Sequence, residues 1–104
     1  MQYRDFGRLA WRASVLGFGC MRLPRVGAAV DETEAIRMIR RAVEGGVNYV
    51  DTAYGYHGGR SEVALGSALR DGYRAKVKVA TKMPHWHVSG AKDFDEAVAK
   101  ICHR

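Results

Sequence analysis

Three apolar segments alternate with three segments of helical pattern along this chain, and this alternation is the feature that most limits its fold. The segments expected to form buried strands are Val15–Gly19, Val47–Asp51 and Val77–Lys82. The segments expected to form helices are Asp31–Glu44, a stretch from Ser61 to about Arg70, and a stretch from Asp93 to about Cys102. Strands that alternate with helices are typical of parallel βα units. The sequence therefore predicts an α/β fold, either an open doubly wound sheet or a barrel.

A hairpin is predicted ahead of these units. Gln2–Phe6 and Trp11–Val15 resemble two short strands, and Gly7 supplies a turn between them. Residues Arg22–Val30, which include Pro24, are expected to form a loop. The predicted order is a hairpin followed by about three βα units, well short of the roughly 200 or more residues of an eightfold barrel.

The helix predicted over Asp31–Glu44 carries the clearest local signals. Asp31 is a good N-cap, and Glu34 completes a pattern like that of a capping box. The apolar residues that share one helical face are Ile36, Ile39 and Val43. The Gly45–Gly46 pair supplies the stop. Ser61 is expected to cap the second helix in the same way as Asp31 caps the first.

Composition and charge exclude several functional classes. The net charge is +6, but lysines and arginines are scattered, so no nucleic-acid partner is expected. No apolar run approaches the roughly 20 residues that a membrane helix needs, so no membrane association is expected. Two cysteines make no disulfide framework, and the expected location is therefore the reducing cytoplasm. The pairs His85/His87 and Cys102/His103 match no standard zinc spacing, and we predict no metal site.

Charged residues end two of the predicted strands. Asp51 and Lys82 would lie at the carboxyl edge of a parallel sheet, which is where active sites form in βα folds. Taken alone, the two residues favour a structural salt bridge. Tyr54 and Tyr56, with His57, follow Asp51 directly. A tyrosine beside a lysine can act as a general acid, because the ammonium stabilises a phenolate. Simple packing of both tyrosines over the strand ends is an equally good explanation of this pattern.

Four ordered motifs resemble those of the aldo-keto reductase family. They are Val15-Leu-Gly-Phe-Gly-Cys-Met-Arg-Leu-Pro24, Gly46-Val-Asn-Tyr-Val-Asp-Thr-Ala53 followed by Tyr56, Ser61-Glu62 with Leu65-Gly66, and Val79-Ala-Thr-Lys82. The resemblance runs from Gln2 to about Asp95, nearly the whole chain. It implies that residues 1–104 are a partial domain, the N-terminal portion of a (β/α)8 TIM barrel whose base is closed by the hairpin.

The resemblance also implies a chemistry, the NADP(H)-dependent reduction of a small-molecule carbonyl substrate by hydride transfer. The family tyrosine lies five residues after the aspartate, which selects Tyr56 over Tyr54 as general acid. Lys82 would favour the phenolate, and Asp51 would hold Lys82 and touch the cofactor ribose. The residues expected beside the nicotinamide are Gly19, Cys20 and Met21, and Trp86 is expected to line the substrate pocket.

The resemblance is incomplete at the catalytic tetrad. The family places a histidine at the end of its fourth strand, and this sequence has none in that position. We expect that the chain stops before the fourth strand, that the isolated chain is inactive, and that it is unstable or prone to self-association. Alternatives are a non-catalytic fragment and a cofactor-binding regulatory protein. A small residue beside the cofactor remains a better interpretation of Cys20 than a reactive thiol.

Overall fold

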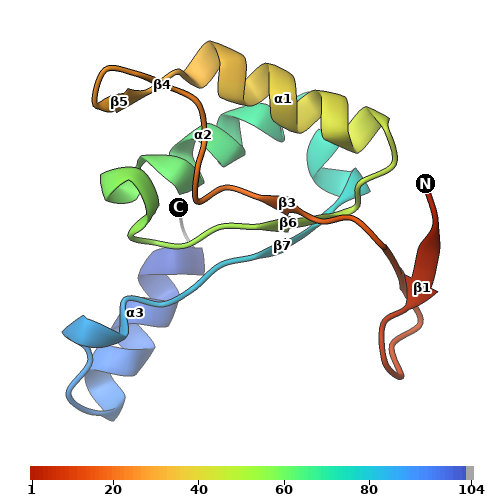
Figure 1. Ribbon diagram of the computed structural model, residues 1–104. Helices are drawn as coiled ribbons and strands as arrows, with labels where there is room; N and C mark the ends of the chain where they lie inside the picture. The colour runs from red at the N-terminus through yellow and green to blue at the C-terminus, as the bar shows by residue number, and fades with distance from the viewer. Residues whose placement is uncertain (103–104) are drawn as a thin grey trace.

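A parallel sheet lies at the centre of the computed structural model, which describes residues 1–102. Its strands are β3 (Phe18–Gly19), β6 (Tyr49–Asp51) and β7 (Lys78–Ala80), in the order β3-β6-β7. Gly19 is level with Asp51, and Asp51 is level with Ala80. All three strands therefore end at one edge, while the N-terminal hairpin lies at the opposite end (Figure 1). The prediction of parallel βα units is confirmed.

The first helix, α1 (Glu32–Glu44), begins at the predicted cap but lacks the predicted capping box. The side chain of Asp31 accepts a hydrogen bond from the Glu34 N–H at 3.1 Å. The Glu34 carboxylate, however, bonds to Arg37 at 2.8 Å instead of reaching back. The Asp31 N–H donates to the Pro24 carbonyl at 2.8 Å, so the donor that the box would satisfy is already paired.

The second helix, α2 (Arg60–Ala68), shows that the predicted role of Ser61 was wrong. Gly59 is the N-cap, with a φ of 91° that favours glycine, and Ser61 lies inside the first turn. Ser61 is fully buried, and its hydroxyl donates to the Cys20 carbonyl at 3.0 Å. Thr52 Oγ1 lies 2.8 Å from Ser61 Oγ. The serine therefore ties the ends of two strands together instead of capping the helix.

The remaining elements complete the described part of the chain. They are the 3₁₀ turns Tyr56–Gly59, Tyr73–Lys76 and His85–His87, the helix α3 (Ala91–Cys102), and the strands β4 (Arg25–Val26) and β5 (Ala29–Val30). The segment predicted as a loop thus contains a small antiparallel hairpin. Gly27 turns it with a φ of 62°. Strands of two residues are too short to produce a readable alternation, which explains the error.

The N-terminal hairpin pairs β1 (Tyr3–Asp5) with β2 (Arg12–Ser14), as predicted. Asn48 fastens it to the sheet. The Asn48 side chain accepts from the Ser14 N–H at 2.8 Å and donates to the Arg12 carbonyl at 2.8 Å. The Asn48 N–H donates to Ser14 Oγ at 3.1 Å. Three hydrogen bonds at one residue therefore fix the hairpin against the start of β6.

The apolar core fills the space between the sheet and the helices α1 and α2, which Figure 1 shows on one side of the strands. Its members include Val50 and Val77 from the strand segments, and Ile39, Val43 and Leu65 from the helices. The opposite face of the sheet holds a cluster of rings formed by Phe6, Trp11 and Tyr49, with centroids 5.4–6.2 Å apart. The adjacent residues Tyr49 and Val50 of β6 thus lie in two different environments.

We predict that the chain self-associates, because several large apolar side chains remain exposed. Phe6 is 45% exposed, Phe94 is 47% exposed and Trp86 is 61% exposed. Within residues 1–102, β7 pairs on one edge alone, and an unpaired edge next to apolar side chains is a template for association. Sedimentation velocity over a range of concentrations is expected to show growing oligomers. A monomer that unfolds sharply, at a temperature independent of concentration, would contradict this.

Candidate active site

An ion pair occupies the carboxyl edge of the sheet. Lys82 Nζ lies 2.5 Å from Asp51 Oδ1 and donates to the Thr52 carbonyl at 2.9 Å. The side chains of Asp51 and Lys82 are 42% and 50% exposed, so the pair is open to a ligand. Because Val50 and Thr52 turn into the buried side, strand alternation directs Asp51 to the face away from α1 and α2.

Tyr56 completes the cluster. The ammonium of Lys82 stands 4.9 Å from the centroid of the Tyr56 ring. The ring of Tyr54 is instead next to Lys100, whose Nζ lies 5.4 Å from the Tyr54 centroid. The structure therefore brings Asp51, Lys82 and Tyr56 together and places Tyr54 against another lysine.

The charge of Lys82 is stable in this setting. Partial burial lowers the pKa of Lys82, but hydrogen bonds and attraction from Asp51 and Tyr56 outweigh it, and the net pKa is raised. The ammonium is accordingly maintained at neutral pH. A permanent cation beside a phenol favours any state in which the phenol oxygen gains negative charge.

A tight turn delivers Tyr56 to this position. His57, Gly58 and Gly59 have φ values of 52°, 61° and 91°, so three successive residues are left-handed. Gly55, before the tyrosine, lies under the indole of Trp86: a Cβ at this position would sit 3.2 Å from Trp86 Cη2. Trp86, expected to line a substrate pocket, therefore packs on the turn that carries Tyr56. Nothing in the local sequence indicates this contact across 31 positions.

The segment expected to bind the cofactor, residues 19–21, lies beside Asp51. Gly19 and Met21 are exposed, and no atom lies within 4 Å of a Cβ built on Gly19. Cys20 is different, because its side chain is fully buried in the core and its N–H donates to the Asp51 carbonyl at 2.8 Å. Of the three, Gly19 and Met21 present accessible surface beside the ion pair.

Burial makes Cys20 a poor nucleophile. Desolvation, with a smaller contribution from Asp51, raises the pKa of the Cys20 thiol to about 12. We predict that iodoacetamide at pH 8 leaves Cys20 unmodified in the folded chain and alkylates it in urea, as peptide mass spectrometry would show. Rapid labelling of Cys20 without denaturant would contradict the buried placement.

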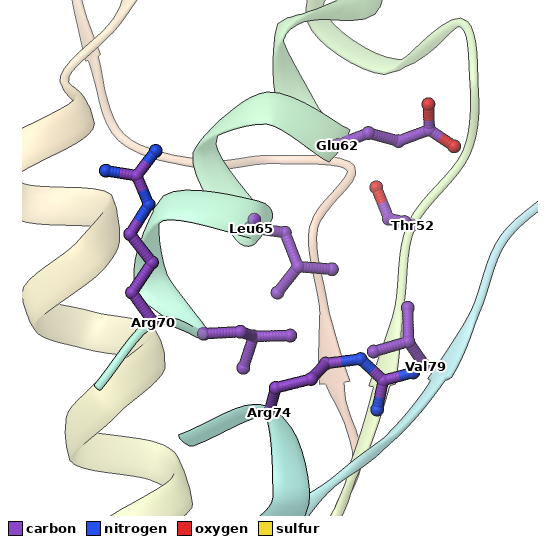
Figure 2. Close-up of a pocket in the computed structure, with 8 residues that line it drawn as sticks. Thr52, Glu62, Leu65, Arg70, Arg74 and Val79 are labelled. Carbon is purple, nitrogen blue, oxygen red and sulfur yellow. The ribbon is translucent and has the colours of Figure 1, made fainter. Parts of the chain in front are cut away.

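A separate groove lies on the helix side of the sheet, between α2 and β7. Figure 2 shows Thr52, Glu62, Leu65 and Val79 around it, with the arginines 70 and 74 at its rim. Thr52 faces this groove while its neighbour Asp51 faces the other side, so the groove is distinct from the Asp51–Lys82–Tyr56 cluster.

Two further findings concern ligands and membranes. Within residues 1–102, no three histidine, cysteine, aspartate or glutamate side chains are grouped so as to hold a metal ion. In the Cys102/His103 pair, His103 lies outside the described residues, and Cys102 is described only in its backbone. Over the same range, the helices are all too short or too polar to cross a membrane.

The sequence profile of the aldo/keto reductase family matches residues 15–104, most of the chain. The chain belongs to the aldo/keto reductase family. A curated relative, a probable voltage-gated potassium channel subunit beta from Oryza sativa subsp. japonica, is 37% identical over 95 residues. That alignment covers 89% of this chain and 28% of the rice protein.

Solved structures place this aldo/keto reductase chain within the barrel. A holo aldo-keto reductase from Bacillus halodurans is 40% identical, with a TM-score of 0.65 over 78% of this chain and 25% of that protein. A thermostable aldo-keto reductase in complex with the inhibitor epalrestat shares the fold, with a TM-score of 0.76, 24% identity, and coverage of 95% and 36%. The chain thus spans about a quarter to a third of these relatives. The expected fold, the N-terminal portion of a TIM barrel, is confirmed.

Proposed function

We propose that this chain carries the proton-donating part of an NADP(H)-dependent carbonyl reductase site. The observation that supports the proposal is the cluster in which Lys82 lies 2.5 Å from Asp51 and 4.9 Å from the ring of Tyr56. A phenol, an ammonium and a carboxylate in this order suit proton delivery to a carbonyl oxygen. The substrate class would be small aldehydes or ketones.

Each residue has a distinct role in the proposed mechanism. The reduced nicotinamide, when bound, supplies hydride to the carbonyl carbon. Tyr56 donates its phenolic proton to the carbonyl oxygen, so the carbonyl becomes an alcohol and the tyrosine becomes a phenolate. Lys82 stabilises that phenolate through its charge, and Asp51 holds the ammonium in place. Solvent then returns a proton to Tyr56.

The edge beside Asp51 suits a cofactor in shape. Gly19 is exposed and level with Asp51 in the strand register, and the space beside its Cα is empty of protein atoms. Met21 is exposed on the same segment. We assign Gly19, Met21 and Asp51 to the nicotinamide end of NADP(H), and Trp86 to the substrate side. Cys20 holds this segment in place through its N–H, which donates to the Asp51 carbonyl.

The proposal is tested by NADPH oxidation with a simple aromatic aldehyde. Because the chain spans only about a quarter to a third of these relatives, we expect no appreciable turnover by the chain alone. We expect turnover by a chimera in which residues 1–102 replace the matching segment of the Bacillus halodurans reductase. A folded chimera that binds NADPH but reduces none of a panel of aldehydes would contradict the catalytic roles assigned to Tyr56, Lys82 and Asp51.

A cofactor-binding regulatory protein is the second candidate, favoured by the 37% identity to a probable potassium channel beta subunit. The two candidates differ in turnover. A regulatory protein would hold NADPH tightly in the same chimera, and quenching of nicotinamide fluorescence would report binding, yet the absorbance of NADPH would not fall when aldehyde is added.

A further inference from the structure

The turn that carries Tyr56 is fastened through the imidazole of the next residue. The Leu23 N–H donates a hydrogen bond to His57 Nε2 at 3.0 Å, joining positions 34 residues apart. Leu23 is 4% exposed and belongs to the core, so its N–H has a fixed direction. The hydrogen bond connects the tyrosine turn to the segment that follows β3 and includes Met21.

The backbone conformation at His57 is unfavourable unless other contacts restrain it. His57 has φ 52° and ψ 40°, a left-handed conformation that costs a residue other than glycine free energy. Gly58 and Gly59 continue the left-handed path, and glycines add freedom to an unrestrained turn. A hydrogen bond from a buried N–H therefore restrains a segment that has little local preference for its shape.

The contact requires a neutral imidazole. Nε2 can accept from the Leu23 N–H only while it carries a lone pair, and a protonated ring would turn an N–H toward another N–H. His57 lines a shallow pocket together with Glu32 from α1 and Arg60 from α2, which pair with each other at 2.7 Å. The β4–β5 hairpin contributes the uncharged residues 28–30 to the same surroundings.

We propose that His57 is a positioning residue that holds Tyr56 over Lys82, and that protonation of His57 releases the tyrosine. This inference rests on the proposed function of Tyr56. It adds a regulation of the same site: the cluster is assembled while the His57 imidazole is neutral and loosens when the imidazole is protonated.

Two substitutions at His57 distinguish loss of the hydrogen-bond acceptor from other effects of replacing the histidine. His57→Gln keeps an acceptor oxygen that does not titrate, and His57→Leu fills similar space without an acceptor. Both place an ordinary side chain in the same left-handed backbone, so their difference reports the hydrogen bond. His85→Leu, in an exposed position of the 85–87 turn, is the control for loss of a histidine.

The experiment is NMR on the whole 104-residue chain, at a concentration below the range in which sedimentation velocity shows oligomers. Amide exchange at Leu23 and the nuclear Overhauser contact between the Tyr56 ring and the Lys82 side chain are followed between about pH 8 and pH 5. The wild type is expected to keep both at pH 8, and on acidification to lose the contact while Leu23 exchanges about tenfold faster relative to neighbouring amides. His57→Gln keeps both throughout, and His57→Leu lacks both.

Retention of the Tyr56–Lys82 contact in folded His57→Leu, or in the wild type after its imidazole has titrated, would overturn the inference. If the leucine variant does not fold, the wild-type titration decides alone. Failure of the proposed function looks different: the contact would respond to His57 as described, while the chimera with intact Tyr56 would reduce no aldehyde.

Discussion

Replacing Tyr56 by phenylalanine is expected to abolish carbonyl reduction by the chimeric barrel while leaving NADPH binding nearly unchanged. The substitution removes one oxygen, the proposed proton donor, and retains the ring that lies by Lys82. General acid catalysis contributes about 10²- to 10⁴-fold to a rate, so kcat should fall by this factor. Steady-state kinetics and fluorescence titration with NADPH measure the two quantities separately.

Tyr54→Phe is the matched control. Tyr54 loses the same atom two positions away, but its ring lies near Lys100 and not near Lys82. We expect a change in kcat of less than about threefold, since no proton transfer is assigned to it. If the Tyr54 variant lost activity and the Tyr56 variant retained it, the assignment by spacing and by contact would both be wrong.

Replacing Ile39 by alanine is expected to destabilise the fold more than other single changes in α1. Ile39 is completely buried between the helix and the sheet. Truncating a buried isoleucine to alanine costs about 2–5 kcal/mol through lost burial and the cavity left behind. For a chain of 104 residues with a small core this is a large share of the total free energy of unfolding.

Met38→Ala is the control for this change. Met38 is the adjacent residue in α1 and is 37% exposed, so it loses apolar atoms without opening a cavity. Alanine is also a strong helix former, and the helix itself is not weakened. Urea unfolding followed by circular dichroism should place the Ile39 variant well below the wild type and the Met38 variant within about 1 kcal/mol of it. Equal losses would show that the core is not centred on Ile39.

The proximity of Asp51 and Lys82 was predictable, because it follows from strand geometry. Parallel strands end at one edge, and side chains alternate along each strand, so Asp51 and Lys82 could be expected on the same side of the same edge. The distance of 2.5 Å between their charged atoms agrees with this. The choice of Tyr56 over Tyr54 came from the family spacing, and the contact with Lys82 is consistent with it.

Two of the other predictions failed because a side chain had more than one possible hydrogen-bond partner. The sequence does not show which partner it takes. Ser61 has the residue type of a helix cap, yet its hydroxyl is taken by the Cys20 carbonyl across 41 positions. Glu34 has the type and spacing of a capping box, yet Arg37 is one turn away and offers a charged partner. His57 was expected only in the loop after Asp51, and the sequence does not indicate that the Leu23 N–H donates to it across 34 positions.

The three hydrogen bonds at Asn48 also bear on the order in which the chain is made and folded. They fix the hairpin through contacts to Arg12 and Ser14, 34 to 36 residues earlier. During synthesis the hairpin emerges before its anchor, which follows only after all of α1 has been translated. Closing so long a loop is costly unless α1 has already drawn β3 and β6 together. The hairpin, although synthesised before its anchor, should therefore be among the last segments to acquire its native contacts.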